Sequence, residues 1–214
     1  MKFERFRKKY QSWPVIPSAV VVREGQAEYQ VTRNQLSRWT KKGNIIPLRK
    51  GMYAFPPEEA TSAPEILTIA NRLYEPSYIS MEYALSLYEL IPEYVPVVTS
   101  VTTRKTMSFE NALGKFSYQH VVSRAFRGFR QEKQAHDRQA FVAEPEKAVL
   151  DFLYLNMPKF REDFEGVLIG SFRFQNLETL NPERIADLSE CYGNGNLLRM
   201  ADKLKGLIQK EKHD

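Results

Sequence analysis

Eight side chains between residues 33 and 50 could bind a polyanion. They are Arg33, Asn34, Ser37, Arg38, Lys41, Lys42, Arg49 and Lys50. No Asp or Glu occurs anywhere in residues 31–53, so these positive charges have no local counter-charge. Arginine recognises guanine edges, asparagine recognises adenine edges, and both lysine and arginine bind phosphates. We therefore expect the first four residues to contact base edges in duplex DNA and the last four to contact its phosphates.

A helix over residues 33–42 would present most of these side chains. Thr32 is expected to cap its first turn, and Val31 is expected to pack on Leu36 as a hydrophobic staple. Gly43 can adopt the left-handed conformation that ends a helix. Leu36 and Trp39 fall on one narrow apolar stripe, which leaves the other side of the helix to donor groups.

Short elements on both sides of this helix complete a small unit. Residues 44–48 and 52–55 predict two strands joined by a turn at Gly51, while helices are expected over 3–12 and, less regularly, over 17–24. A helix followed by a basic hairpin is the pattern of a winged helix-turn-helix. The alternative is a solvated amphipathic helix beside an ordinary hairpin, but such helices usually alternate charge sign, and this one has no acids.

The charge divides the chain into two predicted domains. Residues 1–60 hold 12 Lys or Arg against 5 Asp or Glu, while the remainder holds 19 against 21. We expect a DNA-binding domain over 1–60 and a near-neutral domain over 61–214, joined by a Pro-rich linker near 56–62. No apolar run reaches the length of a membrane span, and no signal-peptide core follows the basic start, so we expect a cytoplasmic protein without a membrane partner.

The second domain changes from helix to strand and back, which predicts an α+β fold. Strands are expected over 95–102, 115–122, 139–143 and, briefly, 172–174. The intervening residues 123–138 are expected to form a long polar hairpin or a partly ordered loop. The predicted helices cover 64–75, 81–90 capped by Ser80, a segment starting at Pro145, 158–170, 183–192 and 197–210.

Two further groups of residues could do chemistry. Glu144, Glu146 and Lys147 combine carboxylates with a lysine, as acid–base catalysis requires, but acids beside Pro145 are also favoured simply by the dipole of a helix start. We favour the second explanation and expect no catalytic residues.

The arginines at 124, 127, 130 and 138 form the other group. Arg124, Arg127 and Arg130 are candidates for binding a partner protein; a solvated hairpin and a second DNA contact remain alternatives. His120, His136 and His213 are dispersed and the only cysteine is Cys191, so we expect no metal site, no disulfide and no cofactor.

Three segments, in this order, resemble the AbiEi-like antitoxins of type IV, abortive-infection toxin–antitoxin systems. They are RWTKKGNIIPLRKGMYAF at 38–55, YISMEYALSLYELIP at 78–92 and AEPEKAVLDFLYL at 143–155. The segments VTTRK at 101–105 and GKFSYQHV at 114–121 fit between them. The resemblance covers most of the chain, but residues 171–214 match only in general character.

The resemblance implies a winged helix-turn-helix domain that represses its own operon by binding inverted repeats in the promoter. It also implies a second domain that counters a nucleotidyltransferase-like toxin, and no enzymatic activity. Two alternatives follow from the residues themselves: a winged-helix regulator whose second domain senses a ligand or dimerises, without a toxin, and a nucleic-acid-processing enzyme that uses Glu144, Glu146 and Lys147.

Overall fold

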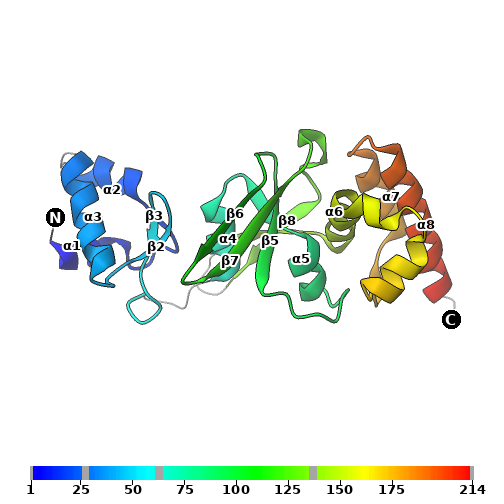
Figure 1. Cartoon of the computed structure of the whole chain (residues 1–214), viewed down its shortest axis with the longest axis horizontal. Helices are drawn as coiled ribbons and strands as arrows, with labels where there is room; N and C mark the ends of the chain where they lie inside the picture. Colours follow the sequence, from blue (N-terminus) through cyan, green and yellow to red (C-terminus); the bar gives the residue numbers. More distant parts are fainter. Residues whose placement is uncertain (1, 26–28, 61–64, 135–138, 213–214) are drawn as a thin grey trace.

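The computed structural model describes residues 2–25, 29–60, 65–134 and 139–212. It is a mixed α/β structure in which the elements follow one another along the long axis (Figure 1). A helical N-terminal unit lies at one end, a large sheet lies in the middle, and the last helices lie at the other end. Within the described residues, no helix is long and apolar enough to cross a membrane.

The N-terminal unit contains three helices and a three-stranded sheet. Its elements are α1 (Phe3–Tyr10), β1 (Ile16–Pro17), α2 (Ser18–Gly25), α3 (Tyr29–Lys41), β2 (Ile46–Arg49) and β3 (Met52–Ala54). The strands are antiparallel in the order β1-β3-β2. The centre of the unit is formed by the buried side chains of Phe6, Tyr10, Leu36 and Phe55. The helix predicted over 3–12 is therefore confirmed as α1, and its aromatic residues lie in the core as their spacing indicated.

The start of α3 differs from the sequence prediction. The helix already includes Tyr29, so Thr32 lies inside it, is 4% exposed and is not a cap. Val31 is 45% exposed and therefore does not form a staple on buried Leu36. Neither Pro nor Gly occurs between Tyr29 and Thr32, so nothing in the chain prevents these residues from continuing the helix. The predicted end is confirmed, because Gly43 has φ +74°.

The middle of the molecule is a six-stranded sheet in the order β6-β7-β5-β4-β9-β8. Its strands are β4 (Ser77–Ile79), β5 (Val97–Thr102), β6 (Met107–Asn111), β7 (Gly114–His120), β8 (Phe129–Lys133) and β9 (Gln139–Ala143). The predicted strands correspond to β5, β7 and β9. The sequence missed β4 because it has only three residues, and it missed β6 and β8 because these edge strands are largely polar.

Residues 123–138 form more structure than the expected polar loop. A 3-10 turn, Ser123–Ala125, leads into β8, and β8 pairs antiparallel with β9. Ala125 is fully buried in the main core. Within the described residues this segment therefore supplies one strand, whose partner β9 lies beyond it, while residues 135–138, including Arg138, lie outside the described residues.

Helices cover both faces of the sheet. Helix α4 (Ile66–Leu73) packs on the face formed by Ile79, Val98 and Tyr118. The opposite face contributes to a second core with α5 (Met81–Leu87), α6 (Pro145–Asn156), α7 (Pro182–Glu190) and α8 (Gly195–Glu211).

The prediction for residues 158–174 was wrong in detail. A 3-10 turn, Met157–Phe160, and a π-helical turn, Gly166–Ser171, replace the expected helix. The expected strand over 172–174 is an irregular segment, and the rings of Phe172 and Phe174 contact the ring of Phe152 in α6. These aromatic contacts with α6 take the place of the expected strand pairing.

The N-terminal unit packs directly on the α4 side of the sheet. Val15, Leu48 and Ala54 belong to the same buried cluster as α4 and the sheet. The side-chain amide of Asn111 in β6 donates a hydrogen bond to the carbonyl oxygen of Leu48 at 3.1 Å. The predicted linker near 56–62 is described only up to residue 60, and the expected helix start at Pro64 lies outside the described residues.

Candidate nucleic-acid interface and a buried polar cluster

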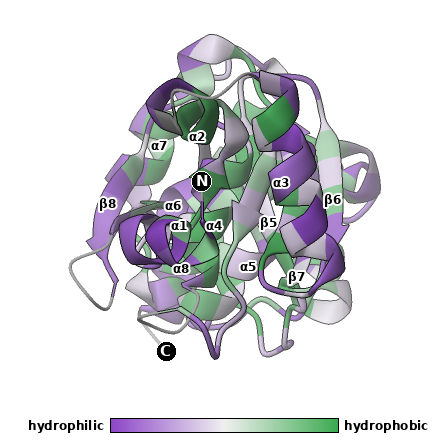
Figure 2. Cartoon of the chain, turned by 90° about the vertical axis from the view of Figure 1, so that its left-hand side faces the viewer, coloured by the Kyte–Doolittle hydropathy of each residue, from purple (hydrophilic) through white to green (hydrophobic). Residues whose placement is uncertain are grey.

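One side of α3 carries the side chains predicted to contact bases. Arg33, Asn34, Ser37, Arg38 and Lys41 are all exposed, whereas Thr32 and Leu36 on the other side are buried. Their spacing places them on neighbouring turns of one helix face. Figure 2 shows α3 at the surface of this end of the molecule, with mostly hydrophilic residues on its outer side.

The inner side of α3 is fixed by aromatic packing. The ring of Trp39 lies 5.3 Å from that of Phe3 and 4.7 Å from that of Phe6, measured between centroids. Phe6 is fully buried, so the helix is attached to the core of its unit through a rigid contact. The orientation of the exposed face is thereby determined by residues that do not belong to that face.

The cations of this face have no acidic partners in the described residues. The ion pairs described within this unit are Arg7 with Glu59 and Lys9 with Glu24, which lie elsewhere. Asn34 accepts a hydrogen bond from the side chain of Gln30 at 3.2 Å through its carbonyl oxygen. Its amide N–H groups have no partner among the described residues and could donate to a base.

Arg49 and Lys50, both predicted to bind phosphates, are placed differently. Lys50 is exposed at the turn, beside Gly51 with φ +79°. Arg49 is half-buried against β6, where its guanidinium lies 5.6 Å from the centre of the Phe109 ring. The hairpin rests on the sheet at this point, and Arg49 therefore contributes to the contact between the two parts of the chain.

A second notable site lies between the sheet and α6, where Asp151 is fully buried. Its Oδ1 accepts hydrogen bonds from Lys147 Nζ at 2.7 Å and from the Tyr192 hydroxyl at 2.7 Å. Its Oδ2 accepts from the Tyr78 hydroxyl at 2.9 Å and from Ser80 Oγ at 2.7 Å. We call these five residues the Asp151 cluster. Four donors saturate the carboxylate, which explains how a charge is tolerated at 0% exposure.

Burial controls the protonation of the Asp151 cluster. It raises the pKa values of Tyr78 and Tyr192 well above their ordinary range, and the negative charge of Asp151 acts in the same direction. Burial also lowers the pKa of Lys147, against the opposing attraction of Asp151. The tyrosines are therefore held as neutral donors. Lys147 and Tyr192 are also in direct hydrogen-bond contact.

The Asp151 cluster joins two of the segments on which the family resemblance is based. Tyr78 and Ser80 belong to the segment 78–92, and Lys147 and Asp151 belong to 143–155. Ser80 was expected to cap α5, but its hydroxyl makes no cap bond and donates to Asp151 instead. A hydrogen bond to an ionised acceptor is stronger than one between neutral groups, which favours the side-chain orientation that reaches Asp151.

Sequence reasoning missed Asp151, Tyr78 and Tyr192 as site residues. A signal was present, because Lys147 and Asp151 are an opposite-charge pair four residues apart inside an apolar helix. The distant partners Tyr78 and Tyr192 gave no comparable signal.

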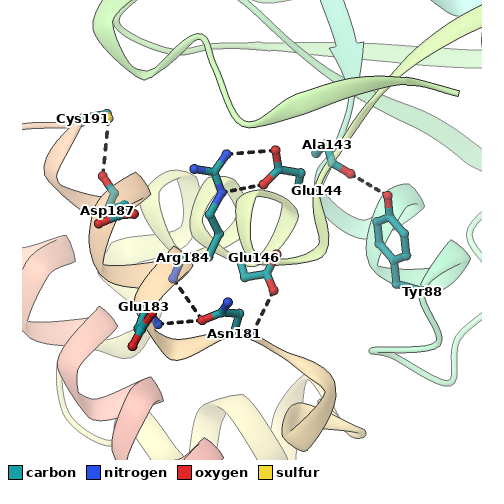
Figure 3. A network of polar contacts seen from close by, with 9 residues as sticks. All are labelled: Tyr88, Ala143, Glu144, Glu146, Asn181, Glu183, Arg184, Asp187 and Cys191. Atoms are coloured by element: carbon teal, nitrogen blue, oxygen red, sulfur yellow. Dashed lines mark hydrogen bonds and ion pairs between the residues drawn. The ribbon is translucent and has the colours of Figure 1, made fainter.

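Glu144, Glu146 and Lys147 do not converge on one site. Glu144 forms a bidentate ion pair with Arg184, with N–O distances of 2.7 and 2.9 Å, and Glu146 accepts a hydrogen bond from the backbone N–H of Asn181 at 2.9 Å (Figure 3). Lys147 points to the Asp151 cluster. Glu144 and Glu146 thus attach the start of α6 to the start of α7, as expected for a structural role.

The three arginines considered for a partner protein also have different surroundings. Arg124 donates to the carbonyl oxygen of Tyr192 at 2.8 Å, and Gly193 leaves room for it, because a Cβ there would lie 2.1 Å from the guanidinium. Arg130 pairs with Glu132 at 3.0 Å. Arg127 is exposed and has no side-chain partner in the described residues. Arg124 and Arg130 therefore have partners within the chain, whereas all three residues are exposed.

In the described part of the chain, no group of three or more His, Cys, Asp or Glu residues could hold a metal ion. His136 and His213 lie outside that part, and the imidazole Nδ1 of His120 contacts the carbonyl oxygen of Arg104 at 3.0 Å. In comparisons with family models and with curated proteins, the chain matches none of either.

Proposed function

We propose that this protein binds duplex DNA through α3, with its N-terminal unit acting as a winged helix-turn-helix. The single observation that supports this most directly is the exposed, acid-free face of α3, whose cations have no partners in the described residues. The order helix, strand, two helices, two strands, with sheet order β1-β3-β2, also agrees with a winged helix. In this proposal α3 enters the major groove.

The proposed contacts divide into two kinds. Arg33, Asn34, Ser37 and Arg38 read base edges, while Lys41, Lys42 and Lys50 hold phosphates. Arg49 is left out, because its guanidinium lies over the Phe109 ring.

We further propose that the protein is an antitoxin that represses its own operon and opposes a nucleotidyltransferase-like toxin. Support for this step comes from the three segments that resemble AbiEi-like antitoxins. Two of these segments, 78–92 and 143–155, meet at the Asp151 cluster. Residues from both segments therefore form one buried site. The protein acts by binding in this proposal, and Glu144, Glu146 and Lys147 have structural roles.

Two measurements test the proposal. Fluorescence anisotropy should show binding to the promoter DNA upstream of the gene at moderate salt, with weaker binding to random duplex. Co-expression with the neighbouring open reading frame should restore growth if that frame encodes a toxin. Failure to bind promoter DNA would refute the first part, and failure to relieve toxicity of any neighbouring product would refute the second.

A winged-helix regulator with a ligand-binding second part and no toxin is the second candidate. One observation favours it: a cavity of about 1090 Å³ lies between the N-terminal unit and the sheet. The absence of a growth defect when the neighbouring gene is expressed alone would favour this candidate over the first.

A further inference from the structure

The cavity of about 1090 Å³ is formed by three parts of the chain. One wall is the segment around Trp13 and Val15, with Met52, from the N-terminal unit. A second wall is the side of α4, and the third is the β8–β9 hairpin with Phe126. Ligand sites typically occupy concave, mostly apolar spaces of roughly 300–1,000 Å³ between such units, so this cavity is large enough for a drug-sized molecule.

Aromatic rings dominate the hairpin wall. The Phe129 ring is perpendicular to that of Phe141, with centroids 5.8 Å apart, and lies 5.1 Å from that of Phe126. Phe141 is 42% exposed and Trp13 on the facing segment is 39% exposed. These two large rings thus remain accessible at the cavity, where a flat molecule could stack on them.

The cavity offers no net charge. Its charged lining residues are Arg72 and Glu75, and they pair with each other at 2.9 Å. A phosphate or carboxylate would find no unpaired cation among the described lining residues, and a cation would find no unpaired acid. The charge distribution therefore favours an uncharged ligand.

Uncommitted polar groups lie beside the rings. The side-chain amides of Gln131 and Gln139 have no hydrogen-bond partner in the described residues. The hydroxyl of Ser77, a residue 6% exposed, is buried without a partner there. Such a group is costly unless a bound molecule satisfies it.

Asn71, in contrast, is fully used by the protein. It links β4 and β9 beyond their single register pair, Ile79 with Val142. Its amide contacts the carbonyl oxygens of Ser77 and Phe141, each at 3.4 Å, and its Oδ1 accepts from the Phe141 N–H at 2.6 Å. The floor of the cavity is therefore fixed, while the amides and the hydroxyl around it have no partner in the part of the chain that the structure describes.

From these observations we propose that the cavity binds an uncharged heteroaromatic compound with the size and polarity of a purine nucleoside. The ring stacks on Phe141 and Trp13, and Gln131, Gln139 and Ser77 bind its polar edge. Because Trp13, Val15 and Met52 belong to the unit that carries α3, a bound ligand also changes how that unit sits on the sheet. Such a change in position would alter the affinity of α3 for DNA. The change in DNA affinity rests on the proposed function, whereas ligand binding does not.

Adenosine is the probe for the first test, which uses the full-length protein without DNA. Isothermal titration should show saturable binding at one site per chain. Phe141→Ala should weaken it by about tenfold, the loss expected when one base-stacking ring is removed. Tyr94→Ala is the matched control, since Tyr94 is an exposed ring, 87% accessible, outside the cavity. It should change the affinity by less than about twofold.

Gln131→Ala and Ser77→Ala provide variants that keep every aromatic ring. Each should weaken adenosine binding by about threefold or more, as expected for a lost hydrogen bond. Ser77→Ala should not lower the unfolding midpoint, because it removes a hydroxyl that has no partner in the described residues. AMP should bind no more tightly than adenosine.

Three results would overturn the ligand proposal. They are no saturable heat with millimolar adenosine, equal affinities for wild type and Phe141→Ala, and AMP binding tighter than adenosine. In a separate anisotropy titration, saturating adenosine should shift the affinity for promoter DNA by at least threefold in wild type but not in Phe141→Ala. An unchanged DNA affinity despite adenosine binding would refute the coupling alone, and absent DNA binding would refute the proposed function alone.

Discussion

Asp151 is the residue whose environment is most demanding, because a buried carboxylate is stable only when its charge is compensated. Lys147 supplies the counter-charge and three hydroxyl groups satisfy the remaining lone pairs. Buried ion pairs contribute little net stability, since desolvation offsets their attraction, but removing one partner leaves the other charge uncompensated. The Asp151 cluster therefore specifies how α6 sits against the sheet and the segment before α8.

Asp151→Asn is expected to lower the free energy of unfolding by about 3–5 kcal/mol, because it leaves Lys147 buried without a counter-charge. Urea unfolding followed by circular dichroism measures this loss. Asp202→Asn is the matched control: Asp202 also pairs with a lysine, Lys205, but its side chain is 72% exposed. Solvent screens that pair, so a small loss is expected. Equal losses in the two variants would contradict the role of Asp151.

Arg38 and Lys50 test the division between base reading and phosphate binding. Arg38→Ala should weaken binding to promoter DNA by about 1–3 kcal/mol and relax the preference over random duplex. Lys50→Ala should weaken binding to both DNAs alike and reduce the slope of log affinity against log salt by about one unit. Anisotropy titrations over a salt series measure both effects. If Arg38→Ala reduced binding to both DNAs equally, Arg38 would not be a base-reading residue.

At the scale of elements, the positions where helices and strands begin and end are determined by backbone geometry and by the residues that surround each turn. Helix α3 ends beside Gly43, and β8 begins after Gly128, both with positive φ near 75°. The surroundings differ, because a Cβ at Gly43 would meet nothing within 4 Å, whereas a Cβ at Gly128 would lie 2.7 Å from Leu188 Cδ2. The first glycine is required for conformation only, and the second also allows close packing.

Gly128→Ala is therefore expected to be more destabilising than Gly43→Ala. Both substitutions carry the same backbone strain, on the order of 1 kcal/mol. Only Gly128→Ala also pushes against the side chain of Leu188, which is 2% exposed, and against Lys147 of the Asp151 cluster. Thermal unfolding of the two variants compares the costs directly. A smaller decrease in Tm for Gly128→Ala would mean that α7 can shift to accept the methyl group.

At the scale of the whole molecule, the N-terminal unit and the sheet share a core. Leu48 and Ala54 are buried in the same cluster as α4 and the sheet, and Arg49 and Asn111 add polar contacts at its edge. Separation of the two parts would expose this apolar surface to water. We therefore expect the units to unfold together, although their net charges differ.

Both tryptophans, Trp13 and Trp39, lie in the N-terminal unit, which makes this expectation measurable. Tryptophan fluorescence reports on that unit alone, whereas far-ultraviolet circular dichroism reports mainly on the rest of the chain. The two signals should give coincident thermal transitions. In Leu48→Ala the fluorescence transition should move to lower temperature than the dichroism transition, because the shared core is weakened. Separate transitions in the wild type would contradict a shared core.

The sequence by itself determined the features that depend only on residues close together in the chain. The acid-free run around α3, its stop at Gly43, the Pro-led start of α6 and the strands β5, β7 and β9 follow from local composition and spacing. These predictions succeeded because helix ends, turns and buried strands are governed by contacts a few residues apart.

Tertiary structure alone decided the remaining features. Tyr78 and Tyr192 reach Asp151 from positions 73 and 41 residues away, and the guanidinium of Arg49 lies over the Phe109 ring, a contact that the sequence did not indicate. The short or polar strands β4, β6 and β8 form because the neighbouring strands pair with them, not because of their own propensity. The cavity between Trp13 and Phe141 has the same origin, since it exists only where separate units of the fold meet.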